Sequence, residues 1–384
     1  MRFPVFIGSS FVAKYPEGGG NFWVPLQYLL GLRALGHDAW WVEILTSGDA
    51  ATGRRAIEVF RRHVEALGVA DRVVLGHVTD GTRNDRPGCV EWIGLPEAEL
   101  DARARDGVLL NFANSLTTPF RARFARTVLV DLDPGPFQLW AREEDMGVGS
   151  HDALVTIGQN LGAPDSRVPL GGVAWGRIWP AVHLPAWPAQ PPPPGGRYTT
   201  VTQWWTRQWA VLDGEIYDCN KRPSFLAVLT LPARVPVALE LAVNLHPDES
   251  DDRRLLACHG WHVVDPNVVA GTPQAFRAYV QGSRGEFSAA KPAYVKARPG
   301  WVSDRTICYL ASGRPCVVEA TGAERHLPPS AGLRFFTTLE EAAEAIVAIE
   351  RDYPAACRAA RALAEEVFAT DVVVPALLRA ACAP

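Results

Sequence analysis

The chain has 384 residues, of which 48% are hydrophobic and 21% are charged, and its net charge is −4. This length accommodates two domains of ordinary size, and the balance of residue types is typical of a globular protein. The negative net charge, without a basic stripe, argues against a nucleic-acid partner, and no apolar run approaches the roughly 20 residues of a membrane-spanning helix. The expected location is the cytoplasm, because the apolar N-terminal stretch is short and polar residues follow it at once.

Seven cysteines are scattered through the chain with no CxxC pair. Such spacing is typical of reduced core residues, not of a disulfide framework or a zinc site. The nearest approach to a ligand cluster, Cys258-His259 with His262, lacks a second pair at suitable spacing. We therefore expect neither a bound metal ion nor another cofactor.

The first half alternates short apolar runs with helix-period segments, which is the pattern of a parallel sheet wrapped by helices. Strands are expected at 5–8, 39–42, 73–75, 108–112, 128–131 and 154–157. The glycine-rich stretch 9–21 is predicted to be a loop, and a helix should follow from about Pro25, because proline is tolerated in a first helical turn. Apolar spacing over 57–67 indicates a second helix. These elements predict a doubly wound domain of roughly six strands.

A proline- and glycine-rich segment, which cannot sustain a helix or a central strand, marks the clearest boundary. It predicts a semi-rigid linker at 183–197, between an N-terminal domain at 1–182 and a C-terminal domain at 198–365. In the second half, strands are expected at 199–202, 237–241, 262–264, 316–318 and 333–336, and helices from about 272 and 339. A C-terminal helix at 366–384 is expected to pack back on the N-terminal domain. The predicted fold class is α/β, with two doubly wound Rossmann-like domains that face each other across a cleft.

The most informative segment, 300–318, combines a loop, a capped helix, a glycine stop and a buried strand. Ser303 is a good N-cap, and Asp304, Arg305 and Thr306 occupy the first helical turn. The unpaired N–H groups and the dipole of such a turn attract phosphate, and serine and threonine hydroxyls add donors. The Arg305 guanidinium offers a bidentate contact to an anion. The segment therefore predicts a phosphate site at 303–306.

The stretch Tyr309-Leu310-Ala311-Ser312-Gly313-Arg314-Pro315, followed by Cys316-Val317-Val318, resembles the donor-binding segment of GT-B glycosyltransferases. The runs 283–291, 300–301, 20–23 and 32–37 resemble a poorly characterised bacterial branch of that family. The resemblance implies a two-domain frame with a nucleotide-sugar donor in the cleft. It also implies that the leaving diphosphate is bound by a helix N-terminus and basic side chains, and not by a metal ion.

Two departures from the family pattern concern the stereochemistry of transfer. Retaining members often carry two glutamates separated by seven residues around this helix, but here Cys308 and a position near Gly300 take their places. The plant-type signature of inverting members is also incomplete, since Gly300-Trp301 lacks the preceding histidine. Both the retaining and the inverting outcome therefore stay open.

Further polar residues at the expected strand ends of the second domain are candidates for donor binding. Thr202 and Gln203 end its first strand, beside Trp204-Trp205. The resemblance implies that Lys221 neutralises the leaving diphosphate. We expect Arg284 or Lys291 to pair with phosphate and Glu286 to accept a hydrogen bond from a ribose or sugar hydroxyl. An ordinary solvated surface position is the alternative for each of these charged residues.

The acceptor side of the cleft is predicted to include the loop after the first strand, with Gly18, Gly19, Gly20 and Asn21. Glycines allow a backbone to approach a ligand closely, and related folds place this loop under the sugar and the acceptor. Asp133, at another strand end, and His151, beside Asp152, are candidates for the base that an inverting reaction requires. A turn-forming role is the alternative for Asp133.

These features predict a glycosyltransferase that moves a sugar from a nucleotide-sugar donor to a small-molecule acceptor without a required metal ion. The thirteen tryptophans favour an apolar or aromatic acceptor, as in the tailoring of secondary metabolites. The identity of the sugar, the nucleotide and the acceptor, and the oligomeric state, are open at this stage. Two alternatives stay open as well: a nucleotide-sugar epimerase on the same frame, which needs no acceptor, and a protein that binds nucleotide or sugar without catalysis.

Overall fold

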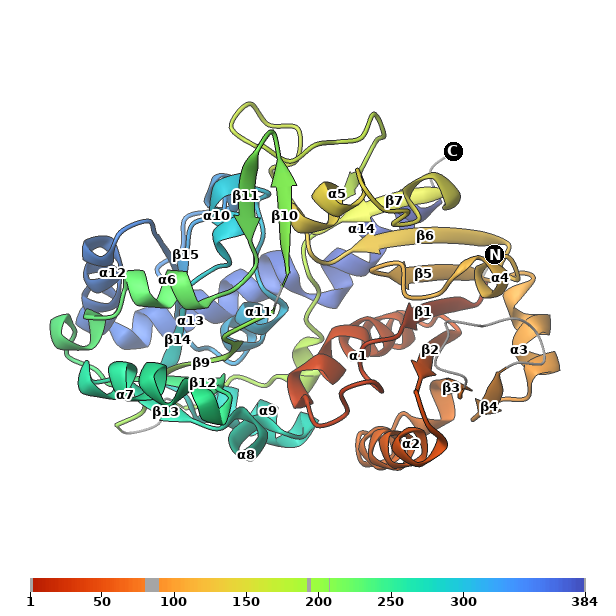
Figure 1. The fold of residues 1–384 in the computed structure, drawn as a ribbon, viewed down its shortest axis with the longest axis horizontal. Coiled ribbons are helices and arrows are strands. Elements are labelled where there is room, and N and C mark those ends of the chain that lie inside the picture. The colour runs from red at the N-terminus through yellow and green to blue at the C-terminus, as the bar shows by residue number, and fades with distance from the viewer. Residues whose placement is uncertain (1–2, 80–89, 192–194, 207, 383–384) are drawn as a thin grey trace.

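The computed structural model describes residues 3–79, 90–191, 195–206 and 208–382. Two parallel sheets organise these residues, one built from each half of the chain (Figure 1). The predicted α/β class with doubly wound sheets is confirmed. The residues outside the described ranges include 1–2 of the predicted N-terminal domain, 192–194 of the predicted linker and 383–384 of the predicted C-terminal helix. The predicted domain boundaries stay predictions.

The first sheet has the strand order β4-β3-β2-β1-β5-β6-β7-β8, in which only β4 runs antiparallel to its neighbour. Its strands are β1 (Val5–Ser9), β2 (Ala39–Thr46), β3 (Val73–Val78), β4 (Glu91–Ile93), β5 (Val108–Phe112), β6 (Arg126–Asp131), β7 (Ala153–Thr156) and β8 (Gly176–Arg177). The order reverses between β1 and β5, and such a switch point opens a crevice at the carboxyl ends of the strands.

The second sheet has the order β13-β12-β9-β14-β15-β16, and its paired strands are all parallel. Its strands are β9 (Tyr198–Gln203), β12 (Leu239–Asn244), β13 (His262–Val264), β14 (Gly285–Ser288), β15 (Cys316–Glu319) and β16 (Leu333–Phe336). This is the same doubly wound order, with the switch point between β9 and β14. The strand β14 was not predicted, because its four residues GEFS show neither an apolar run nor strict alternation.

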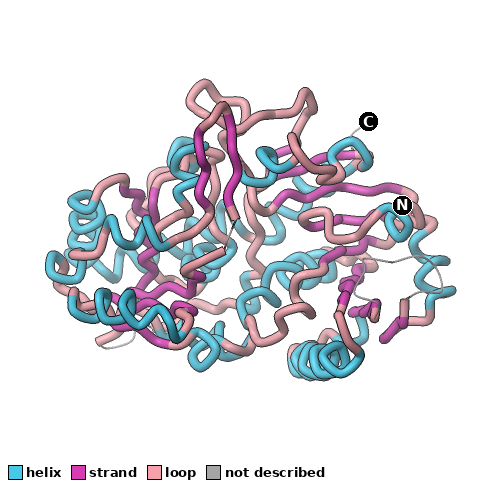
Figure 2. The backbone as a smooth tube through the Cα atoms, in the orientation of Figure 1, coloured by secondary structure: helices cyan, strands magenta, loops and turns pink. Residues whose placement is uncertain are grey.

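Helices cover both sheets, as the cyan segments of Figure 2 show. They are α1 (Gly19–Ala34), α2 (Ala50–Ala66), α3 (Glu97–Ala104), α4 (Thr118–Arg121), α5 (Pro136–Trp140), α6 (Arg222–Ala227), α7 (Ser250–Cys258), α8 (Pro266–Ala270), α9 (Pro273–Gly282), α10 (Pro292–Ala297), α11 (Asp304–Ala311), α12 (Leu339–Arg351), α13 (Tyr353–Leu363) and α14 (Thr370–Ala381). In the part of the chain that the structure describes, no helix has the length and apolarity needed to cross a membrane.

Side-chain caps explain where several of these helices begin. The hydroxyl of Thr272 accepts the N–H of Ala275 at the start of α9, at 3.0 Å, and Thr338 does the same for Glu341 at the start of α12. The predicted start of the first helix near Pro25 is wrong, because α1 already begins at Gly19 and Pro25 lies inside it. Two adjacent glycines are unfavourable in a helix, so the sequence favoured a loop there.

The glycines are needed because α1 packs against the second half of the chain. A Cβ atom on Gly19 would lie 2.2 Å from the carbonyl oxygen of Thr272, and Trp23 Nε1 donates to the carbonyl of Pro273 at 3.0 Å. A second seam joins the loop after β7 to the loop before α11, where Asn160 N donates to Pro299 O at 2.9 Å. The two sheets are thus docked through backbone contacts on two sides of the space between them.

Two further segments connect the two halves of the chain. The C-terminal helix α14, blue in Figure 1, packs against α1 and β7 of the first half. An antiparallel hairpin of β10 (Trp209–Leu212) and β11 (Glu215–Asp218), which was not predicted, stands between the two sheets in the same view. It is fixed on both sides, because Trp140 Nε1 donates to Trp209 O at 3.0 Å and Lys296 donates to Ile216 O at 3.1 Å.

Candidate functional site

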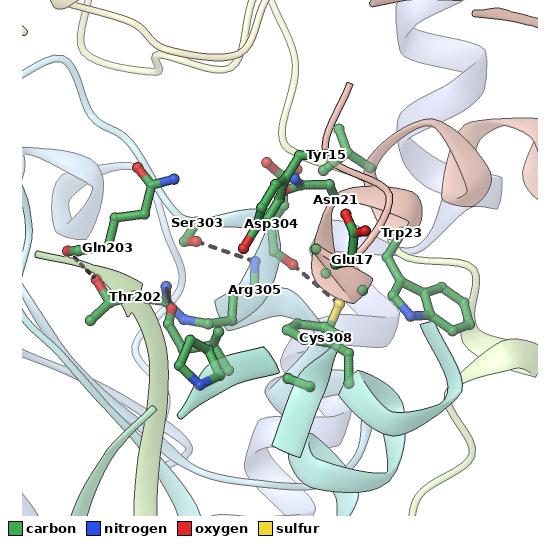
Figure 3. A pocket seen from close by; sticks show the side chains of 18 of the residues that line it. Tyr15, Glu17, Asn21, Trp23, Thr202, Gln203, Ser303, Asp304, Arg305 and Cys308 are labelled. Carbon is green, nitrogen blue, oxygen red and sulfur yellow. Dashed lines mark hydrogen bonds between the residues drawn. The ribbon is translucent and has the colours of Figure 1, made fainter. Parts of the chain in front are cut away.

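A cavity of about 510 Å³ lies between the two halves of the chain, at the carboxyl ends of β9 and β12. The second half contributes Val201, Thr202, Gln203, Asn244, Pro266, Asn267, Ala270, Phe276, Ser303, Asp304, Arg305 and Cys308, and the first half contributes Tyr15, Glu17, Gly18, Gly19, Gly20, Asn21, Trp23, Val24, Gln27 and Ala181. Figure 3 shows Thr202 and Gln203 on one side, Trp23 on the other, and Ser303 to Arg305 between them. The cavity therefore brings together nine of the sixteen predicted site residues: Gly18, Gly19, Gly20, Asn21, Thr202, Gln203, Ser303, Asp304 and Arg305.

The first turn of α11 forms one wall of this cavity. The Ser303 hydroxyl accepts the N–H of Arg305 at 3.2 Å, as expected of an N-cap (Figure 3). Ser303 and Asp304 are half-buried and line the cavity, whereas Thr306 is buried and faces a small hollow of about 10 Å³ behind it. Thr306 thus does not line the cavity, and its role as a phosphate ligand stays a prediction. The helix N-terminus itself faces the cavity as predicted.

Arg305 lines the cavity but turns its guanidinium toward the sheet. Its Nε donates to Glu286 at 2.6 Å, and its other nitrogens donate to Val201 O at 2.8 Å and to Ser288 Oγ at 2.5 Å. The Glu286 carboxylate is fully buried in β14 and is not among the residues that line the cavity. The carboxylate holds Arg305, so this arrangement does not support the prediction that Glu286 accepts a hydrogen bond from a sugar hydroxyl, which stays a prediction.

Lys221 and Lys291 are also engaged within the protein. Lys221 is buried and donates to Ala289 O at 3.0 Å, and burial, with Arg305 nearby, lowers the pKa of its amine well below the usual range. Lys291 pairs with both oxygens of Asp133 at 3.1 Å, and the Tyr294 hydroxyl donates to the same carboxylate. None of these residues lines the cavity. Lys291 and Asp133 form an ion pair between the two halves. The roles of Lys221 and Lys291 toward phosphate, and of Asp133 as a base, stay predictions that these contacts do not support.

Arg284 and His151 lie at the wrong ends of their strands for the predicted roles. Arg284 precedes β14 and forms a two-pronged ion pair with Glu350 of α12, with its shortest contact at 2.6 Å. His151 precedes β7, and its ring contacts Gly147 O at 2.6 Å and Asn111 Nδ2 at 3.0 Å. Burial lowers the pKa of His151 to about 4. Ligands of parallel sheets bind at the carboxyl ends of strands, so this placement gives no support to the phosphate contact predicted for Arg284 or to the catalytic base predicted at His151, and both stay predictions.

The loop between β1 and α1 forms the opposite wall, and we call residues 10–18 the strap. Glu43, buried in β2, anchors it: the carboxylate accepts the N–H groups of Val12 at 2.8 Å and Ala13 at 2.9 Å. Ser9 Oγ and Trp41 Nε1 donate to its other oxygen. At its far end, Tyr15 donates to Asn267 of α8 at 3.0 Å, across the seam between the halves. The predicted glycine loop is therefore held in place from both sides.

Several cavity residues were missed by sequence reasoning. Asn244 ends β12, so the rule that ligands meet the carboxyl ends of strands would have found it. Asn267 follows the N-cap Asp265 of α8, a cap pattern that was visible in the sequence. Gln27 lies inside α1 and bridges the two halves: its Nε2 lies 3.7 Å from Cys308 Sγ, and its Oε1 accepts the N–H of His183 at 2.7 Å. No local sequence signal marks Gln27.

Two titratable groups of α11, Asp304 and Cys308, line the cavity. Burial raises the pKa of Asp304 to about 6, so this carboxylate titrates near neutral pH at the helix N-terminus. Burial and the neighbouring Asp304 also raise the pKa of Cys308 well above the usual range, which keeps its thiol neutral. The position at which related retaining enzymes often carry a glutamate is thus neutral here.

No protein-family model and no curated protein matches the chain. Solved structures do match over nearly its whole length. Anabaena HepE in complex with UDP and glucose aligns with 98% of this chain and 99% of its own, at 11% identity and a TM-score of 0.54. An alpha-glucosyltransferase in complex with UDP-glucose and DNA aligns over 100% of both chains, at 10% identity and a TM-score of 0.56. Sucrose-phosphate synthase from Thermosynechococcus elongatus aligns over 98% and 97%, at 11% identity and a TM-score of 0.52.

The chain has the GT-B fold. At these identities the likeness concerns the fold alone. The GT-B fold agrees with the two doubly wound sheets and with the position of the cavity between them, where α11 and the strap face each other.

Proposed function

We propose that the protein is a glycosyltransferase that binds a nucleotide-sugar donor in the 510 Å³ cavity and transfers the sugar to a small-molecule acceptor. The observation that carries this proposal is the meeting of three elements in one cavity: the N-terminus of α11, the carboxyl ends of β9 and β12, and the glycine-rich start of α1. Structural neighbours with the same fold were solved with UDP and UDP-glucose, which supports a nucleotide-sugar as the donor.

The chemistry follows from which groups face the cavity. Free N–H groups of the α11 first turn and the Ser303 hydroxyl offer hydrogen bonds to the diphosphate, and they stabilise the charge that develops on it as it leaves. No metal ion is required in this proposal. The DNA in one neighbour belongs to that protein; the net charge of −4 still argues against nucleic acid as a partner of this chain.

Calorimetric titration with UDP-glucose, UDP, GDP, ADP, dTDP and CDP tests the donor site directly. We expect micromolar binding of one nucleotide family, and we expect Ser303→Asp to weaken it about tenfold or more. One added negative charge near the diphosphate costs on the order of 1–4 kcal/mol. Ser303→Asn is the matched control, because Asp and Asn are both N-caps as good as Ser. The control variant should bind like wild type, and all three proteins should melt at similar temperatures.

Two outcomes contradict the donor site. If wild type and Ser303→Asp bind the nucleotide with equal affinity, the diphosphate does not bind at the N-terminus of α11. Absence of binding to every nucleotide by folded protein would remove the donor proposal altogether. Sugar transfer is then measured as acceptor-dependent release of the nucleotide, since an epimerase would convert the donor without an acceptor and a binding protein would release none.

Asp304 makes donor affinity depend on pH. Above about pH 6 its carboxylate is ionised and repels the diphosphate, and protonation removes this repulsion as the pH falls through the raised pKa. We therefore expect UDP-glucose to bind about three- to tenfold more tightly at pH 5.5 than at pH 8. The two phosphates of UDP-glucose carry no proton that titrates in this range. Asp304→Asn should bind tightly at both pH values in the same titration; a pH dependence that survives in this variant would assign it to another group.

A further inference from the structure

A second hollow, of about 460 Å³, opens beside the donor cavity. It lies at the carboxyl ends of β9 and β12 and is lined by Gln203, Trp204, Trp205, Asn244, His246 and Glu249. Two of these residues, Gln203 and Asn244, also line the donor cavity. In Figure 3 the Gln203 side chain lies at the side of the cavity away from Trp23 and Cys308. The second hollow, which we call the Trp205 hollow, therefore continues the donor cavity on the Gln203 side.

Trp205 is held in place although its side chain is 45% exposed. The preceding Trp204 is fully buried, and its Nε1 donates to Asp252 at 2.7 Å. Arg222 donates two N–H groups to the same carboxylate, at 2.7 and 2.8 Å, and its guanidinium lies over the Trp205 ring at 5.7 Å. Such a cation–π contact from an arginine that is itself fixed by a bidentate ion pair orients the indole. The hollow thus presents an ordered aromatic surface to solvent.

The rim around this aromatic surface is made of uncommitted hydrogen-bonding groups. Within the described part of the chain, the side-chain amides of Gln203 and Asn244 have no hydrogen-bond partner, and each offers two donors and one acceptor. Glu249 uses one oxygen to accept the N–H of His246 at 2.6 Å, which leaves the other for a ligand. Among the described residues that line the hollow there is no lysine or arginine.

One apolar ring face beside a rim of amides and a carboxylate fits a pyranose ring. The C–H groups on one face of a sugar pack against the negative π face of an indole, while its hydroxyls both donate and accept at the rim. An aromatic acceptor of the kind expected from the sequence would favour an enclosed apolar slot, whereas four of the six residues that line this hollow are polar.

We propose that the Trp205 hollow is an acceptor subsite for carbohydrate, in which a sugar unit of the acceptor stacks on Trp205 while the reacting unit enters the donor cavity past Gln203 and Asn244. This inference rests on the proposed glycosyltransferase function. In the reaction an acceptor hydroxyl oxygen forms a bond to the anomeric carbon of the donor sugar. The bond from that carbon to the diphosphate oxygen breaks, the electron pair leaves with the nucleoside diphosphate, and the hydroxyl proton passes to solvent.

The test measures glycan binding to the UDP-loaded protein by saturation-transfer NMR. The panel contains maltose, cellobiose, lactose and N,N′-diacetylchitobiose, with the phenol quercetin as the aromatic competitor. At least one disaccharide should bind saturably to wild type and bind about three- to tenfold more weakly to Trp205→Ala, the loss expected for one aromatic contact. Trp205→Tyr, which keeps an aromatic ring, should retain most of the binding. Trp209→Ala is the matched control, because Trp209 is 61% exposed on the hairpin but lines neither hollow.

UDP-glucose titrations of the same variants separate the two proposals. Equal UDP-glucose affinity in wild type and Trp205→Ala, with no disaccharide bound, overturns the carbohydrate subsite and leaves the donor site standing. Disaccharide binding that Trp205→Ala does not weaken overturns the assignment to this hollow. Quercetin binding that depends on Trp205, in place of sugar binding, overturns the class of acceptor. Failure of every nucleotide of the donor panel to bind folded wild type counts against the proposed function itself.

Discussion

Replacing Arg305 with methionine is expected to lower the free energy of unfolding by about 3–5 kcal/mol, the loss typical when one partner of a buried ion pair is removed. Glu286 is 0% exposed, and the contact of Arg305 Nε with its carboxylate is 2.6 Å long. The same guanidinium also holds Val201 O and Ser288 Oγ. It therefore joins α11 to the two central strands β9 and β14, and its removal leaves a buried charge unpaired. Urea unfolding followed by circular dichroism at pH 7.5 measures this loss.

The double variant Arg305→Met/Glu286→Gln separates charge from packing. When both partners of a buried pair become neutral, the loss is much smaller, so we expect the double variant to recover most of the lost stability. Arg234→Met is the matched control, since Arg234 and Glu340 form an exposed pair at 2.8 Å that contributes at most about 1 kcal/mol. A double variant as unstable as the single one would show that the unpaired Glu286 charge is not the cause.

This burial also limits what an Arg305 variant can say about function. A loss of nucleotide binding in Arg305→Ala would follow from disturbed packing of α11 as readily as from a lost contact to phosphate. Ser303, by contrast, exchanges for Asp or Asn without loss of its capping bond, and it lines the cavity. The charge of the helix N-terminus is therefore best tested at Ser303.

The sequence predicted those parts of the site that depend on local rules. The cap at Ser303, the glycine stop after α11 and the following strand are set by short-range preferences, so the wall that α11 gives to the cavity was found from them. Alternation of strands and helices predicted both sheets, because parallel strands separated by helices leave few other arrangements. The glycine loop was also placed correctly beside the ligand cavity, although its last residues belong to α1.

The charged residues of the site were less predictable, since a charge in the sequence does not reveal its partner in space. Arg284 and Glu286 are two residues apart, yet one pairs with Glu350 of α12 and the other with Arg305 of α11. Asp133 and Lys291 were predicted to have different roles, but they form an ion pair with each other although they are 158 residues apart in the sequence. Only the folded chain determines which of these groups remain available to a ligand.

Glu43 was missed for a related reason. A single carboxylate within the apolar run AWWVEILT is typical of an outward-facing residue on a half-buried strand, but this strand is buried on both faces.

Replacing Glu43 with alanine is expected to lower the free energy of unfolding by roughly 3 kcal/mol or more. Three buried donors, Ser9 Oγ and the N–H groups of Val12 and Ala13, lose their acceptor, whereas Trp41 Nε1 keeps Ser9 Oγ; each orphaned group costs about 1–3 kcal/mol, which removal of the buried charge offsets in part. UDP-glucose affinity should fall as well, although Glu43 does not line the cavity, because the strap loses its anchor.

The pH dependence of stability distinguishes an anchor of this kind from ordinary packing. Burial raises the pKa of Glu43 from 4.5 to about 7, despite the lowering effect of its hydrogen bonds, which corresponds to about 3 kcal/mol. Because the folded-state pKa is raised, this contribution to stability is complete below about pH 4.5 and is lost as the pH rises through 7. Asp131, Asp304 and Glu319, with pKa values raised to about 6, change in the same direction at lower pH.

Urea unfolding of wild type and Glu43→Gln between pH 5 and 8.5 isolates the Glu43 contribution. Wild type should lose stability between about pH 5 and 7 and change little above that, whereas Glu43→Gln should lose less over this range, because glutamine does not titrate. Glu58→Gln is the matched control, since Glu58 forms only an exposed ion pair with Arg62 on α2. Identical pH profiles for wild type and Glu43→Gln would mean that Glu43 keeps its charge throughout this range. The strap would then be anchored by a permanently ionised carboxylate.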